Sequence, residues 1–84
     1  MSGARTTDVT APPGGVMTDD VGVITGLLTV RTTVDGRGDV AVHVQYKDAD
    51  EWYAVRNARV HLADPADLDA VHAIVVALLN RPNG

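Results

Sequence analysis

Apolar and polar residues alternate through the middle of the chain, a pattern typical of a β-strand with one buried face. In VGVITGLLTVRTTV, residues 21–34, most odd positions from residue 25 onward carry threonine or arginine. The even positions that carry the apolar side chains are Ile24, Leu28, Val30 and Val34. We therefore predict a strand whose even-numbered side chains face the core.

A second alternating segment, VAVHVQYK at residues 40–47, follows the turn residues DGRGD at 35–39. Its even positions carry valine and tyrosine, so both segments present an apolar face in the same phase. We predict an antiparallel hairpin in which the opposed residues are Val34 and Val40, Val30 and Val44, and Leu28 and Tyr46.

The segment EWYAVRN, residues 51–57, predicts a third antiparallel strand with an ambiguous buried face, because Trp52 and Tyr53 belong to opposite phases. We favour Tyr53 and Val55 facing the core, which directs Arg56 outward. The apolar phase changes again in ARVHL, residues 58–62, and we expect a bulge or turn near Asn57 followed by a short final strand.

Helix boundary signals follow in the C-terminal part of the chain. Asp64 suits the N-cap, Pro65 suits the first helical position, and Pro82 is expected to stop the helix after Asn80. At about 100° per residue, one apolar stripe faces the sheet. This stripe comprises Leu68, Val71, Val75, Leu78 and Leu79.

The apolar arc of this helix is wider than one sheet face can bury, because Ile74 and Val76 flank the stripe and alanines fill much of the far side. We expect a second copy to cover the excess, since a two-fold dimer needs one self-complementary patch. The alternative is a monomer with an exposed alanine-rich helix. The predicted dimer interface is Val71, Ile74, Val75, Leu78 and Leu79.

The first twenty residues have no apolar period and contain the breaker PPGG at residues 12–15. We predict a disordered tail at residues 1–20 and a single domain at residues 21–84. The alternative for this tail is an arm that binds a partner or adds a strand, with Val16 and Met17 as its apolar contacts.

The predicted fold is α+β: a small antiparallel meander of three to four strands with one C-terminal helix packed on one face. A domain of 84 residues has a thin stability margin, and its lack of cysteine removes disulfides as a supplement. Oligomerisation is the remaining common supplement, which supports the predicted dimer.

Candidate chemistry is sparse. His43, His61 and His72 lack the spacing of a metal site, and we expect His72 to be a packed, hydrogen-bonded side chain. The one serine, Ser2, has no base placed beside it by sequence. We therefore predict a protein that is not an enzyme and has no catalytic residues, metal ligands or cofactor.

A net charge of -4 argues against general affinity for nucleic acid or anionic membranes. Neither a targeting segment nor an apolar run long enough for a membrane span is evident, so we expect a cytoplasmic protein with no membrane partner. The open sheet face offers a partner-binding surface of basic groups around one aromatic ring. Its residues are Arg31, His43, Lys47, Trp52 and Arg56.

The function predicted from these patterns is a small non-enzymatic homodimeric interaction or regulatory module that acts through protein–protein contacts. One alternative is nucleic-acid binding by the open sheet face, through Arg31, Lys47, Trp52 and Arg56. A second alternative is binding of a small apolar ligand between helix and sheet.

Overall fold

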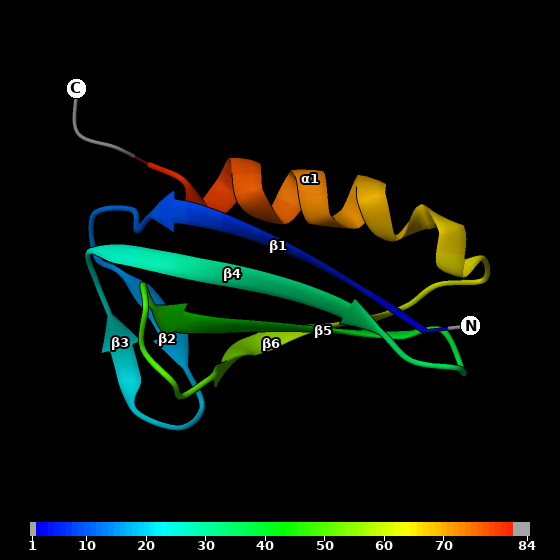
Figure 1. Cartoon of the computed structure of the whole chain (residues 1–84), viewed down its shortest axis with the longest axis horizontal. Coiled ribbons are helices and arrows are strands. Elements are labelled where there is room, and N and C mark those ends of the chain that lie inside the picture. Colours follow the sequence, from blue (N-terminus) through cyan, green and yellow to red (C-terminus); the bar gives the residue numbers. More distant parts are fainter. Residues whose placement is uncertain (1, 82–84) are drawn as a thin grey trace.

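The computed structural model describes residues 2–81 and has an α+β fold, in which one helix packs against a six-stranded antiparallel sheet (Figure 1). The strand order across the sheet is β1-β4-β5-β6-β2-β3. The elements are β1 (Gly3–Thr10), β2 (Val16–Thr18), β3 (Gly22–Ile24), β4 (Leu27–Val34), β5 (Asp39–Tyr46), β6 (Tyr53–His61), the 3-10 turn η1 (Pro65–Asp67) and α1 (Leu68–Leu79).

The hairpin of β4 and β5 has the predicted register, with Val34 opposite Val40 and Leu28 opposite Tyr46. Its loop is ordered by the carboxylate of Asp35, which accepts hydrogen bonds from the backbone N–H groups of Arg37 and Asp39. This register confirms the predicted pairing. It forms because both strands carry their apolar residues in one phase.

The predicted face of β6 and the irregularity near Asn57 are also confirmed. Tyr53 and Val55 pack against the core, and Arg56 is exposed. Asn57 has a φ of 62°, and the register with β5 shifts next to it, as expected for a bulge. The strand continues through this bulge to His61, so that β6 replaces the two separate strands that the sequence predicts.

The predicted count of three to four strands is too low for two reasons: the first twenty residues supply two strands, and the single strand predicted over residues 21–34 is divided into β3 and β4 at Gly26, whose φ is 87°. β1 pairs along its whole length with β4, from Gly3 opposite Val34 to Thr10 opposite Leu27. β2 pairs with β3 and, at Thr18, with β6. The unstructured tail predicted for residues 1–20 is thus corrected to ordered backbone in the described residues.

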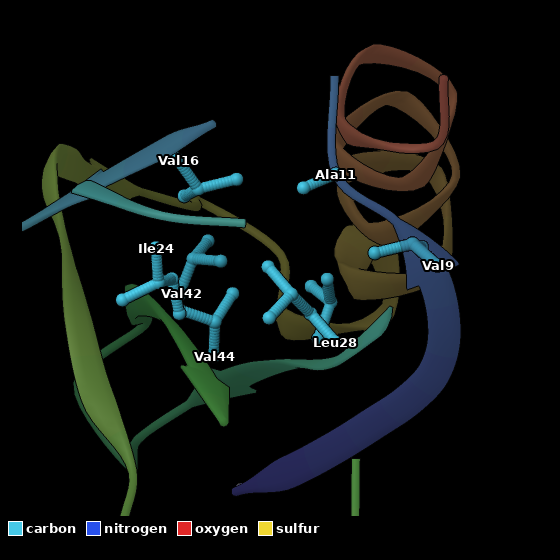
Figure 2. Packing of buried hydrophobic residues seen from close by; sticks show 8 residues of the cluster. Val9, Ala11, Val16, Ile24, Leu28, Val42 and Val44 are labelled. Atoms are coloured by element: carbon cyan, nitrogen blue, oxygen red, sulfur yellow. The ribbon is translucent and has the colours of Figure 1, made fainter. Parts of the chain in front are cut away.

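The core lies on one face of the curved sheet and is covered from two directions. α1 packs over β1 and β4, and the β2–β3 hairpin covers the other side (Figure 1). Figure 2 shows side chains from the hairpin meeting those of β1, β4 and β5. The main buried cluster comprises Val9, Ala11, Val16, Ile24, Leu28, Val30, Val42 and Val44.

The predicted cap is confirmed, since the Asp64 carboxylate accepts a hydrogen bond from the Ala66 N–H at 2.9 Å, but it caps the 3-10 turn η1, and α1 itself begins at Leu68. α1 is buried at Leu68 and packs Val75 and Leu79 against the sheet. Pro82, the predicted helix stop, lies outside the described residues. The backbone is already extended at Asn80, whose N–H bonds to the carbonyl of Val76.

The predicted helix stripe is wrong at Leu78, which is 68% exposed. Leu78 and Val76 lie at roughly the same angular distance, about 80°, on opposite sides of Leu68. Val76 packs against the core because α1 is anchored toward β1 on that side, whereas Leu78 points to the opposite side. The anchoring polar contacts therefore decide which flank is buried.

Two glycines of the β4–β5 loop test how closely this loop approaches the segment that follows β6. Gly38 has a φ of +90°, and a methyl group there would collide with the carbonyl of Leu62, which follows β6. Gly36 has open space around it. We predict that Gly38→Ala lowers the free energy of unfolding by on the order of 2–4 kcal/mol. Gly36→Ala should change it by less than about 1 kcal/mol.

Urea denaturation of both variants measures this difference. Equal stability of the two variants would contradict the close approach of the loop to the segment after β6.

Candidate interaction surfaces

His72 fastens α1 to the sheet. Its Nε2 lies 2.7 Å from the hydroxyl of Thr7 on β1, and its Nδ1 lies 2.8 Å from the hydroxyl of Thr32 on β4. A neutral imidazole has one donor and one acceptor, and hydroxyls can complement both. The predicted packed, hydrogen-bonded histidine is confirmed.

Burial of the imidazole is the main reason that the pKa of His72 lies below its ordinary value. The positive charge of Arg5 acts in the same direction, and the carboxylate of Asp69 acts in the opposite one. Since Thr32 is fully buried, the His72 contact joins helix to sheet and offers no open position for a substrate. Among residues 2–81, no group of three or more histidine or carboxylate side chains could hold a metal ion.

One side of α1 is tied to β1 by further polar contacts. Arg5 forms an ion pair with Asp69, near the start of α1. At the other end, the Asn80 side-chain oxygen accepts from the Thr10 N–H at 3.0 Å, and the Thr10 carbonyl accepts from the Arg81 N–H at 2.8 Å. The helix therefore runs along β1 in the same direction as the strand.

The other side of α1 is apolar and uncovered. Ile74 is 63% exposed and Leu78 is 68% exposed. Of the five residues predicted to form a dimer interface, these two lie on the surface, whereas Val71, Val75 and Leu79 pack against the chain's own sheet. We call Ile74 and Leu78 the apolar flank of α1.

The open sheet face brings three of its five predicted residues together. The Arg31 guanidinium lies 5.5 Å from the centre of the Trp52 ring, a cation–π contact, and Arg31 stands opposite His43 in the β4–β5 register. The other two cations are engaged elsewhere: Lys47 pairs with Asp8 at 3.4 Å, and Arg56 pairs with Asp19 at 3.2 Å.

Carboxylates also occupy this part of the sheet. A hydrogen bond from the Thr29 hydroxyl, at 2.7 Å, is the main cause of a lowered pKa at Asp8, and Lys47 adds to the shift. The ionised carboxylate of Asp8 thus places a negative charge beside Lys47, in a pair that is about half exposed to solvent.

The sequence prediction missed Arg59, which stands opposite Ala41 after the bulge in β6. Arg59 and the small residues Ala4, Thr33 and Ala41 line an open hollow of about 920 Å³. Asp35, Asp39 and His61 line the same hollow, with His61 and Asp39 paired at 2.9 Å. The change in the phase of apolar positions after Asn57 is visible in the sequence and was the signal that could have placed Arg59 beside Ala41 in this hollow.

Another hollow, of about 380 Å³, lies beneath the start of the helix. Val34 and Leu68 contribute apolar surface, whereas Arg5 and Asp64 bring charge to its lining. Most of the lining surface is nevertheless apolar, as expected for the predicted apolar ligand between helix and sheet.

No family model matches this chain, and neither a curated protein nor a solved structure is significantly similar to it. No helix within residues 2–81 is long and apolar enough to cross a membrane.

The lowered pKa of His72 predicts a pH-dependent stability. Because the unfolded chain takes up the proton first, the free energy of unfolding should fall as the pH drops through about 6.5, the ordinary histidine value. The stabilisation contributed by neutral His72 is fully present above that pH. In His72→Gln, the fall between about pH 7 and pH 5 should be smaller than in the wild type.

Urea denaturation across this pH range tests the prediction, because comparison with the variant removes the contributions of other titrating groups. The same pH slope in both proteins would contradict the assigned role of His72.

Proposed function

We propose that the protein is a non-enzymatic homodimeric interaction module, which acts through protein–protein contacts made by the apolar flank of α1. The observation that carries this proposal is the exposure of Ile74 and Leu78, one helical turn apart on the side of α1 that faces away from β1. Neither side chain belongs to the buried clusters or packs against them.

The energetics support a second copy as the occupant. Complete burial of an isoleucine or leucine side chain contributes roughly 1.5–3 kcal/mol, and a two-fold contact buries each residue twice. The exposed alanines Ala70 and Ala77 lie beside this flank, so that another helix can approach closely. Part of the gain offsets the loss of rotational and translational freedom on association.

Nucleic-acid binding by the open sheet face has less support. The Arg31–Trp52 contact favours it, since both groups can stack on bases. However, Arg31 already covers a face of the ring, and Lys47 and Arg56 are paired with carboxylates. The net charge of -4 adds a general repulsion of phosphates.

Leu78→Asp tests the proposed interface. Because Leu78 is 68% exposed, the variant should fold, with a free energy of unfolding within about 1 kcal/mol of the wild-type value apart from the contribution of the dimer. Its dissociation constant should rise by at least roughly 100-fold, because two carboxylates would be placed in one apolar contact.

The measurement is solution mass by light scattering over a concentration series. Leu27→Asp is the matched control, since Leu27 is 60% exposed on the open sheet face and the change in charge is the same. A wild type that stays monomeric at every concentration, or a Leu78→Asp protein with wild-type mass, would reject the proposed interface.

A further inference from the structure

β1 forms one edge of the sheet. β1 has one neighbour, β4, so half of its backbone groups point away from the sheet. The Leu27 carbonyl accepts from the Lys47 N–H and so points toward β5. Leu27 stands opposite Thr10, so these two residues form a non-hydrogen-bonded pair. The backbone N–H and carbonyl of Thr10 therefore face away from β4.

Backbone direction alternates along a strand, so Ala4, Thr6 and Asp8 share the outward direction of Thr10. The contacts of Thr10 with Asn80 and Arg81 agree with this assignment, because they reach β1 from outside the sheet. Arg5, Thr7 and Val9 consequently pair with β4.

Both ends of this edge are occupied by the chain itself. The Thr10 N–H and carbonyl bond to Asn80 and Arg81, and the Ala4 carbonyl accepts from the Arg5 guanidinium at 2.9 Å. Between these ends, the outward backbone groups of Thr6 and Asp8 have no hydrogen-bond partner within residues 2–81. The stretch from Ala4 to Asp8 contains no proline or bulge that would block strand addition, and its two charged residues are engaged within the chain, Arg5 with Asp69 and Asp8 with Lys47.

We propose that a second copy of the chain adds to this edge, with the two β1 strands antiparallel and centred on Thr6. Thr6 then faces Thr6 of the second copy, and Ala4 faces Asp8 of the second copy. The outward N–H and carbonyl groups of these residues bond across the two-fold axis, and the two sheets become continuous. The Ala4 carbonyl, which already accepts from Arg5, accepts the Asp8 N–H of the second copy through its second lone pair. The inference rests on the proposed function only in taking the protein to be self-associating.

The edge is self-complementary, which favours a second copy over a foreign strand. In this register Asp8 stands opposite Ala4 and Arg5 stands opposite Thr7, so no like charges face each other. The occupied groups of Thr10 define where pairing stops, and by symmetry they limit both ends of the shared stretch.

The position of α1 fits the same arrangement. α1 lies over β1 and β4, so a helix axis midway between these strands, which are about 4.8 Å apart, is roughly 5 Å from the two-fold axis. The two helices would then lie roughly 10 Å apart, within the range of helix packing. Ala73, next to His72 at the middle of α1, meets the second helix on this side.

This edge and the apolar flank lie on opposite sides of α1, so each can form a dimer by itself, and use of both at once would join dimers into a larger assembly. Occupation of the edge leaves Ile74 and Leu78 exposed. The two interfaces can therefore be tested separately by substitution.

Thr6→Pro is the direct test. The Thr6 N–H points outward, so proline removes no β1–β4 hydrogen bond, and proline is tolerated in edge strands at such positions. The change deletes one donor from each copy and places a ring at the centre of the pairing, so we expect the dissociation constant to rise by roughly 100-fold. Thr6→Val keeps the backbone N–H, so its dissociation constant should equal that of the wild type.

Light scattering of the wild type, both Thr6 variants and Leu78→Asp separates the two interfaces, with circular dichroism to verify folding. A solution mass that falls below the wild-type value in folded Thr6→Pro but not in Thr6→Val supports the β1 interface, and this holds for any mass of Leu78→Asp. Wild-type mass in folded Thr6→Pro overturns it, even when Leu78→Asp is monomeric and the proposed function stands. A monomeric wild type overturns both. If Thr6→Pro does not fold, Ala4→Pro, which removes another outward N–H, replaces it under the same criteria.

Discussion

The attachment of α1 to the β1 side of the sheet is the constraint on which the other features depend. A single twelve-residue helix cannot cover one face of a six-stranded sheet, so its lateral position decides what is buried. His72, Asp69 and Asn80 fix that position through Thr7, Arg5 and Thr10 of β1. The uncovered remainder of the core is closed by the β2–β3 hairpin, and the helix surface that faces away from β1 stays apolar and exposed.

The parts of the fold that could be predicted are those with apolar alternation or strong local signals. The β4–β5 register follows from valines in one phase, and the helix start follows from Asp64 and Pro65. β1 could not be found in this way, because its inward positions are satisfied by polar contacts with the helix. Thr7 bonds to His72 and Arg5 pairs with Asp69, which leaves Val9 as its one buried apolar side chain.

The same contacts explain why the candidate surfaces were predicted only in part. Helical periodicity places Leu78 as close to the sheet-facing direction as Val76, and the anchoring on the β1 side breaks this symmetry. On the open sheet face, the strand phases brought Arg31, His43 and Trp52 together. The neutralising partners of Lys47 and Arg56 come from segments that the sequence analysis treated as tail, so the basic character of that face was overestimated.

The central claim is that β1 is an ordered edge strand, fastened beneath α1, whose outward backbone groups receive a second copy. Amide hydrogen exchange, measured residue by residue along β1 at several protein concentrations, tests it most directly. The account predicts slow exchange for Arg5, Thr7 and Val9 at all concentrations, and protection of Thr6 and Asp8 that increases with concentration. Fast exchange along the whole of β1, or Thr6 and Asp8 amides that stay unprotected when the protein is concentrated, would contradict it.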